Sequence, residues 1–156
     1  MIRVRKPATD DELAYRFVPV GSRSISKRRT TGGLFLIPPF AATLTILVYQ
    51  PNVPIAQPIA VACGSLFGAA IGTVLSVLLG FGPGIALLAA FIAMIILPLL
   101  RVFHPPGVAL AMCPALLHSG AWFAILVVLP FTLAAVISRA VLGRVVSNWS
   151  RYPASF

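Results

Sequence analysis

The chain has 156 residues and a formal net charge of +9, although only 10% of its residues are charged and 59% are hydrophobic. A soluble domain carries roughly 25% charged residues and about 45–50% apolar ones. With a mean hydropathy of +0.99, this composition excludes a soluble enzyme, because the chain lacks the polar surface that such a fold needs. The basic residues flank apolar runs, so we expect the lipid bilayer, and no nucleic acid, as a partner.

The N-terminal region is polar and differs from the rest of the chain. Residues 1–30 hold eight of the twelve basic residues and all three acids. We expect residues 1–30 to be a basic cytosolic tail, 31–145 a transmembrane helical domain and 146–156 a short C-terminal tail. The apolar run after residue 30 favours a retained anchor over a cleaved signal peptide. An organelle transit segment is the alternative, but the acids at 10–12 argue against it, so we expect a bacterial cytoplasmic (inner) membrane protein.

Four apolar stretches suit membrane-spanning helices, since a hydrocarbon core of about 30 Å needs about 20 helical residues. They are residues 33–49, 59–79, 85–100 and 121–138. The sequence therefore predicts an all-α, polytopic membrane helix bundle of about four transmembrane helices. Basic residues precede the first stretch and follow the last, so the positive-inside rule predicts that both termini are cytosolic.

A fifth apolar stretch, residues 104–119, contains three prolines. Counting it as a crossing would place the basic C-terminus outside the cell. We therefore interpret it as a Pro-started half-helix after the third transmembrane helix, which enters and leaves on the outer side. Membranes tolerate such a segment where it is buried in protein or lines a cavity. A fifth span is the alternative.

The start of this half-helix is the first candidate binding site. Arg101 and His104 precede Pro105, Pro106 and Gly107. Proline in the first turn costs no helical hydrogen bond, and the free amides of that turn favour an anion, as does the helix dipole. Arg101 would add a full charge and His104 a titratable one, so we expect these five residues to bind substrate. The competing interpretation is that Arg101 extends to the outer headgroups and that His104 lies in the interface.

Three more polar residues are candidates for substrate binding. Residues 38–44 and 105–111 both begin with Pro-Pro, and an odd number of crossings between them would give the opposite directions of an inverted repeat. This similarity, for which chance is the alternative, adds Thr43. Gln57 would either donate to an anion or close the turn before the second helix. Ser65 would either line a pathway or bond to its own helix.

Three glycines, Gly64, Gly68 and Gly72, are spaced four residues apart in the second predicted helix. Glycines at this spacing lie on one helix face and let another backbone approach closely. The partner helix belongs either to the same protomer or to a second copy. Because four helices are few for enclosing a gated path, we expect a homo-oligomer packed through these glycines.

No pattern of residues points to catalysis or to a metal. His104, Cys113 and His118 fall in one short stretch, but their spacing matches no set of ligands. The sequence also has no nucleophile and base pair, no Gly-rich phosphate loop and no paired carboxylates in its apolar part. We therefore expect no enzyme activity, no metal and no cofactor.

Residues 34–143 resemble the HPP family of integral membrane proteins, which is named after the His-Pro-Pro found here at 104–106. The PIAQP sequence at 54–58 is similar to the family's P-L-A-Q-P, and the Gly-rich helix follows in the same order. The resemblance implies a helical membrane protein of the group that includes chloroplast and cyanobacterial nitrite transporters. We expect an additional N-terminal span of the family to be absent. The chain departs from the family's polar positions at Ile59, Ala60, Ser65 and Leu110.

Two functions from different classes follow from these observations. The first is an integral membrane transporter or channel subunit for a small anion such as nitrite, which uses helix N-termini near the HPP motif. The alternative is a non-transporting membrane scaffold or assembly subunit, whose basic tail binds anionic lipid or a cytosolic protein. Loss of the family's polar positions favours the second function if those positions belong to the anion path.

Overall fold

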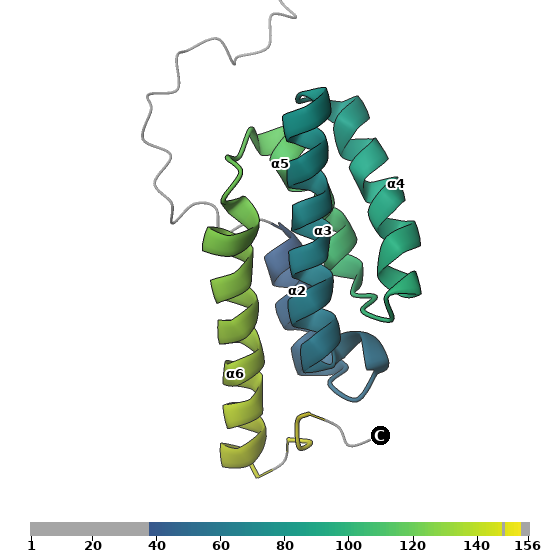
Figure 1. The fold of residues 1–156 in the computed structure, drawn as a ribbon. Helices are drawn as coiled ribbons and strands as arrows, with labels where there is room; N and C mark the ends of the chain where they lie inside the picture. The colour runs from purple at the N-terminus through teal and green to yellow at the C-terminus, as the bar shows by residue number, and fades with distance from the viewer. Residues whose placement is uncertain (1–37, 148, 154–156) are drawn as a thin grey trace, which may run out of the picture. The chain divides into compact units, whose positions relative to one another are not determined.

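The described part of the protein is all helical. The computed structural model describes residues 38–147 and 149–153, so the predicted tail at 1–30 and the start of the first predicted helix lie outside the described residues. The described residues form no strand (Figure 1). The elements are α2 (Pro38–Tyr49), η2 (Pro54–Ala56), α3 (Pro58–Leu79), α4 (Pro83–Leu99), α5 (Pro105–Leu117), the π-helical turn η3 (Ala124–Val128) and α6 (Leu129–Val145).

Prolines determine where most helices begin. Helices α2, α3, α4 and α5 each begin at a proline, which has a suitable φ and needs no N–H partner in the first turn. The π-helical turn η3 precedes Pro130, whose missing N–H removes one bond from the continuous helix. Between α3 and α4 the chain reverses at Gly80 and Gly82, with φ values of 94° and 132° that glycine adopts without steric cost.

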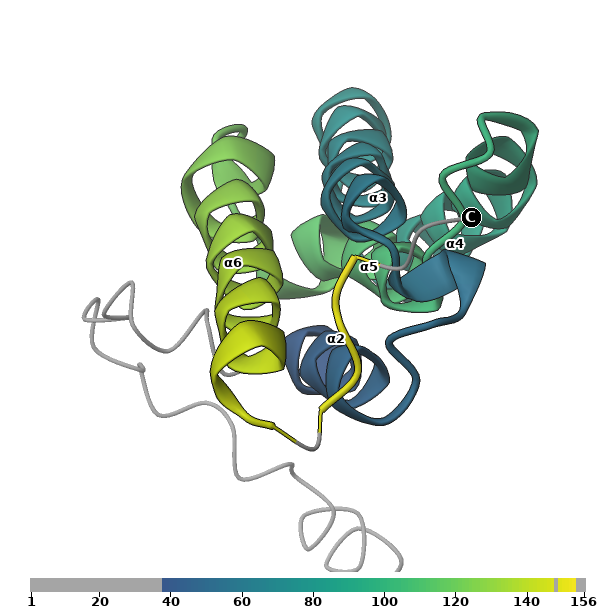
Figure 2. The same ribbon diagram turned by 90° about the horizontal axis from the view of Figure 1, so that it is seen from below.

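Helix α3 is the central element of the bundle. Figure 1 shows it between α4 and α6, and Figure 2 shows α5 and α2 beside the row that these three helices form. Helix α3 packs against α4, α5 and α6, and its buried positions include Gly64, Gly68 and Gly72. The bundle therefore depends on the small residues of α3, which let several helices share one central neighbour.

Helix α5 runs along α3 from one end to the other and does not turn back. Gly64, in the first third of α3, lies against the carbonyl oxygen of Val102, just before α5 begins. At the far end, the Gly82 N–H donates to the carbonyl oxygen of Ala115 over 3.1 Å. The expected path for residues 104–119, entering and leaving on one side, is therefore wrong. The segment is a Pro-started short helix, as predicted, but it joins opposite ends of the bundle (Figure 1).

Helices α2 and α6 run in the same direction. The rings of Phe40 and Phe131 stack with centroids 4.0 Å apart, and further along both helices Arg139 Nε donates to the carbonyl oxygen of Leu47 over 2.8 Å. The start of α2 and the end of α6 therefore point to opposite ends of the bundle. The prediction that both termini are cytosolic requires an even number of crossings, which the described helices do not give. The location of the termini stays a prediction.

The described helices differ in length. Two apolar helical stretches of 22 residues, Pro58–Leu79 and Ala124–Val145, are long enough to cross a membrane. The other described helices have 12, 17 and 13 residues in chain order. The predicted all-α membrane bundle is confirmed, but the predicted end of the last helix at residue 138 is wrong, because α6 continues to Val145.

The four arginines of the described residues gather at one end of the bundle. The α4–α5 loop, which carries Arg101, is tied to η2 because His104 Nδ1 donates to the carbonyl oxygen of Ile55. The C-terminal segment is tied to the same place, because the Tyr152 hydroxyl donates to the carbonyl oxygen of Ala56. We expected Arg101 on the outer side, away from the basic C-terminus. The structure places it at the same end as the C-terminal arginines, so this expectation is wrong. The positive-inside rule predicts that this end faces the cytosol.

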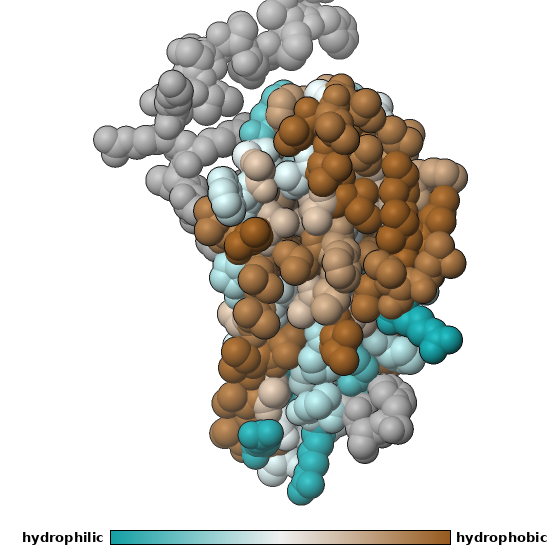
Figure 3. All heavy atoms as spheres, viewed as in Figure 1, coloured by the Kyte–Doolittle hydropathy of each residue, from teal (hydrophilic) through white to brown (hydrophobic). Residues whose placement is uncertain are grey.

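The remaining surface of the bundle is largely apolar. Figure 3 shows hydrophobic residues covering the α3 and α4 side, while hydrophilic residues gather at the lower end. A soluble fold would bury such side chains, whereas a helix in lipid exposes them. Large apolar side chains with at least two thirds of their surface exposed are Tyr49, Ile59, Val77, Leu78, Leu87, Leu99, Trp122 and Val145.

Candidate functional site

His104 is fully buried where α2, α3 and α5 meet. Its side chain has no exposed surface, and the residue caps the start of α5. On α3 it lies beside Gly64, which is six residues, or about 9 Å, from the start of that helix. His104 therefore lies inside the bundle rather than at its surface.

The ring of His104 has a hydrogen-bond partner on each nitrogen. Nδ1 lies 2.8 Å from the carbonyl oxygen of Ile55 and Nε2 lies 3.1 Å from Oγ1 of Thr43. Because a carbonyl only accepts, Nδ1 carries a hydrogen, and Nε2 of the neutral ring accepts from Thr43. Thr43 Oγ1 also lies 3.1 Å from the carbonyl oxygen of Pro39. A protonated ring would donate to Thr43, which would then donate to Pro39. Both ring nitrogens of His104 therefore have a hydrogen-bond partner in either charge state.

Ser65 follows Gly64 on α3 and differs from the other buried hydroxyls of that helix. Thr73 and Ser76 donate to the carbonyl oxygens of Ala69 and Gly72 in their own helix, over 2.8 and 2.7 Å. Ser65 has no exposed surface, and its Oγ has no hydrogen-bond partner among the described residues. A buried hydroxyl without a partner costs about 1–3 kcal/mol, which is expected where a side chain serves a purpose other than stability.

The glycines of α3 pack against α5 of the same chain. A Cβ atom built at Gly68 would collide with the carbonyl oxygen of Gly107, and one at Gly72 would collide with that of Ala111. Gly107 in turn lies against the carbonyl oxygen of Gly64. The predicted close approach of two backbones is present, but the expected packing of a second copy through these glycines is wrong, and homo-oligomer formation stays untested.

The helix start itself offers no free amides to an anion. Pro105 and Pro106 have no N–H, and the Gly107 N–H donates to the carbonyl oxygen of His104 over 2.8 Å. Pro105 is exposed, whereas Pro106 and Gly107 are buried. The expectation that this first turn binds an anion through its backbone is therefore wrong, and any ligand at this place would be bound by side chains.

Arg101 does not share the environment of His104. It is exposed in the loop after α4 and has a left-handed backbone with φ of 58°. Of the two expected ionisable groups, the structure therefore places only His104 in the bundle interior.

Gln57 has the turn role, one of its two predicted roles. Its Nε2 donates to the carbonyl oxygens of Pro51 and Val53 over 3.0 and 3.2 Å, and the residue caps α3. These bonds close the loop between α2 and α3. The loop also supplies the Ile55 carbonyl to His104, so Gln57 acts on the site through the shape of this loop.

The two helices that begin with Pro-Pro run in opposite directions, as their similarity predicts. Leu47 packs with Val61 near the start of α3, whereas Phe40 packs with Ala69 further along it, so α2 is antiparallel to α3 and α5. A hydrogen bond joins Thr43 of α2 to His104, the residue that caps α5. Thr43 is thus the sequence candidate that the structure brings into direct contact with His104.

Arg139 is a buried charged residue that the sequence prediction missed. It is 3% exposed and reaches the carbonyl oxygen of Leu47 and both oxygens of Ser150. The sequence prediction ended the last helix at residue 138 and treated Arg139 as part of a basic flank. The signal that could have revealed it is the aromatic pair Trp149 and Tyr152, whose rings suit an arginine.

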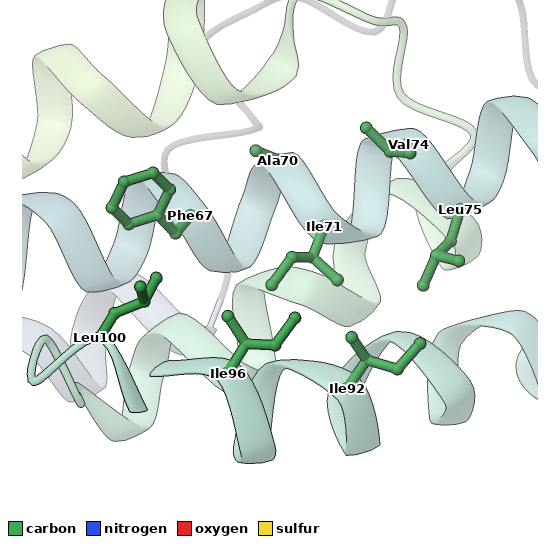
Figure 4. A pocket seen from close by; sticks show the side chains of 8 residues that line it. All are labelled: Phe67, Ala70, Ile71, Val74, Leu75, Ile92, Ile96 and Leu100. Atoms are coloured by element: carbon green, nitrogen blue, oxygen red, sulfur yellow. The ribbon is translucent and has the colours of Figure 1, made fainter. Parts of the chain in front are cut away.

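An apolar hollow lies between α3 and α4 on another face of the bundle. Figure 4 shows apolar side chains from both helices around it, and they offer no donor or acceptor to an anion. The hollow therefore suits hydrocarbon and is not a candidate for the polar site. It is lined by Phe67, Ala70, Ile71, Val74, Leu75, Ile92, Ile96 and Leu100.

The bond between Thr43 and His104 predicts a loss of stability in the Thr43→Val variant. Removing the hydroxyl leaves Nε2 of a fully buried ring without its partner, so we expect unfolding to become easier by about 1–3 kcal/mol. Thr45→Val is the matched control, because Thr45 is exposed and bonds only within its own helix, to Ala41. Chemical unfolding of the purified protein in detergent measures both variants. Equal stability of the two variants would contradict the role of the bond.

The helical bundle, its apolar outer surface and its buried polar centre define an integral membrane protein. The family model described as "HPP, transmembrane region" matches residues 15–153, and the chain therefore belongs to the HPP transmembrane family. No curated protein and no solved structure matches the chain. The His-Pro-Pro sequence at 104–106 begins with the histidine that is buried where three helices meet.

Proposed function

We propose that this membrane protein transports a small anion, with nitrite as the first substrate to test. The single observation that carries the proposal is the fully buried pair of His104 and Thr43, together with the unpartnered hydroxyl of Ser65, which follows the glycine of α3 that His104 contacts. Ionisable groups inside a membrane are costly, and they often mark substrate pathways. A bundle built for stability alone would place apolar side chains at these three positions.

The chemistry of the three side chains suits an anion that only accepts hydrogen bonds. Ser65 has a hydroxyl hydrogen with no acceptor, Thr43 has one that reaches His104 or Pro39 in the closed contact, and a protonated His104 would add an N–H at Nε2. Nitrite is small, carries one charge and offers acceptor oxygens only. In this family Ser65 stands where a histidine is usual, so a neutral donor replaces an ionisable one near the path.

Substrate would reach these donors through a movement of α2. In the described conformation His104 has no exposed surface, and Thr43 covers its Nε2. Separating the two side chains would leave Nε2 of His104 open, which is a donor only when the ring is protonated, and would let the Thr43 hydroxyl donate either to Pro39 or to the anion. Both groups keep a second partner, Pro39 for Thr43 and Ile55 for His104, so opening this contact leaves neither side chain without a hydrogen bond.

The test is uptake of nitrite into proteoliposomes that contain the purified protein. We expect His104→Ala to lower the uptake rate at least tenfold, and Ser65→Ala and Thr43→Val to lower it several-fold. Arg101→Asn is the matched control, because it removes a charge at the same end of the bundle while asparagine tolerates the left-handed backbone of that position. We expect the control to change uptake less than threefold.

Two results would contradict the proposal. Uptake that is unaffected by His104→Ala would remove these side chains from the path. Absence of flux for nitrite, nitrate, formate and chloride, together with another membrane protein that co-purifies in fixed ratio, would favour the non-transporting scaffold.

A further inference from the structure

Arg139 carries a charge that no acidic residue balances in the described part of the chain. All three acids of the sequence lie at residues 10–12, outside the described residues. Nε and Nη2 of Arg139 bond to Leu47 and Ser150, but Nη1 is buried and has no hydrogen-bond partner among the described residues. A buried charge is normally paired, so this guanidinium indicates a missing anion.

A polar pocket adjoins the free nitrogen of Arg139. Gly143 separates the two, and a Cβ atom at this glycine would lie 2.7 Å from Arg139 Nη1. The pocket therefore has a third guanidinium directly behind one of its walls, in addition to the two that line it. The lining residues are Gly143, Arg144, Arg151, Tyr152 and Pro153.

Aromatic rings hold Arg139 in place without reducing its charge. The guanidinium carbon lies 5.0 Å from the centroid of the Trp149 ring and 5.6 Å from that of Tyr152. The Tyr152 hydroxyl donates to Ala56 over 2.7 Å, and burial raises the pKa of Tyr152 to about 12. Tyr152 thus stays neutral at physiological pH. The pocket combines three positive charges with no negative one from the described residues.

We infer that this pocket binds a phosphate group, supplied by the headgroup of an anionic phospholipid. Guanidinium groups match phosphate oxygens with paired hydrogen bonds, so the two arginines that line the hollow, with the charge of Arg139 behind its wall, fit this group better than a carboxylate. The lipid is the expected source because the pocket adjoins the end of α6, where Arg144 lies among the exposed apolar side chains of Val141, Leu142 and Val145. Anionic lipids are abundant in the cytosolic leaflet, which the basic end is predicted to face.

The experiment titrates the full-length protein in a neutral detergent with dioctanoyl phosphatidylglycerol and follows the thermal unfolding temperature. We expect a saturable rise with the phosphatidylglycerol and none with dioctanoyl phosphatidylcholine. The double variant Arg144→Gln, Arg151→Gln should weaken binding at least tenfold. Arg101→Asn, which removes a charge at the same end but outside the pocket, should change the affinity less than twofold.

Further measurements separate the lipid from other sources of negative charge. Inorganic phosphate at millimolar concentration should not reproduce the rise, and if it does so as well as the lipid, the assignment to a lipid is wrong. Equal affinities of the double variant and the Arg101 control would overturn the pocket. A second result would also overturn the proposal. If neutralising the acids at 10–12 lowered the unfolding temperature without lipid as much as the double variant does, the chain itself would supply the anion.

Discussion

Gly68→Ala is expected to destabilise the protein by about 3 kcal/mol or to prevent folding. The added Cβ atom would collide with the backbone carbonyl of Gly107, which cannot rotate away as a side chain could. Forcing extra atoms into a packed interior costs about 1–3 kcal/mol, and more where the obstacle is backbone. Thermal and chemical unfolding in detergent measure this loss, and nitrite uptake should fall with it.

Gly84→Ala is the matched control for this variant. Gly84 lies in the first turn of α4, and a Cβ atom there would meet nothing within 4 Å. Alanine suits a helix better than glycine, so this variant is expected to gain about 0.5–1 kcal/mol. Opposite signs for the two substitutions are the expected result. Wild-type stability of Gly68→Ala would show that α3 and α5 do not touch at this point.

Arg139→Lys is expected to destabilise the protein by about 2–4 kcal/mol although it keeps the charge. Arg139 bonds to Leu47 of α2 and to two oxygens of Ser150, and a lysine has no planar fork with which to reach both segments. The variant leaves a buried charge and a buried carbonyl poorly satisfied, which is costly. Unfolding measured without added lipid tests this prediction.

Arg144→Gln is the control for Arg139. Arg144 is exposed on the same helix, and an exposed substitution usually changes stability by less than about 0.5 kcal/mol. Arg139→Met adds a second test, because it removes the buried charge itself and leaves only the carbonyl oxygens of Leu47 and Ser150 without their donor. A stable Arg139→Met variant that no longer responds to anionic lipid would assign the arginine to binding, whereas a wild-type response would contradict the pocket.

Much of the fold could be predicted because its signals are local. Prolines mark the starts of the helices, and small residues four apart in α3 mark the face that another backbone approaches. The spacing of the glycines does not reveal which helix packs against them. The glycine face packs against α5, about 40 residues further along the chain, and this could not be separated from packing against a second copy.

The candidate site could be predicted in part, for the same reason. His104 and Thr43 were candidates on separate grounds, and their contact joins residues 61 positions apart. Arg139 was missed because its partner Leu47 is 92 positions away. In the sequence, a charge after an apolar stretch was interpreted as the end of the membrane span. The expected binding by backbone amides failed because Gly107 bonds to the residue that caps its own helix.

The glycine contacts between α3 and α5 also limit how the protein can move. A rotation of α3 about its own axis by one residue would bring Ser65, Ala69 or Thr73 against the backbone of α5, where there is room for hydrogen only. We therefore expect α3 and α5 to move together as one rigid unit. Access to His104 must then come from displacing α2 and the loop that follows it, which hold the ring through Thr43 and Ile55.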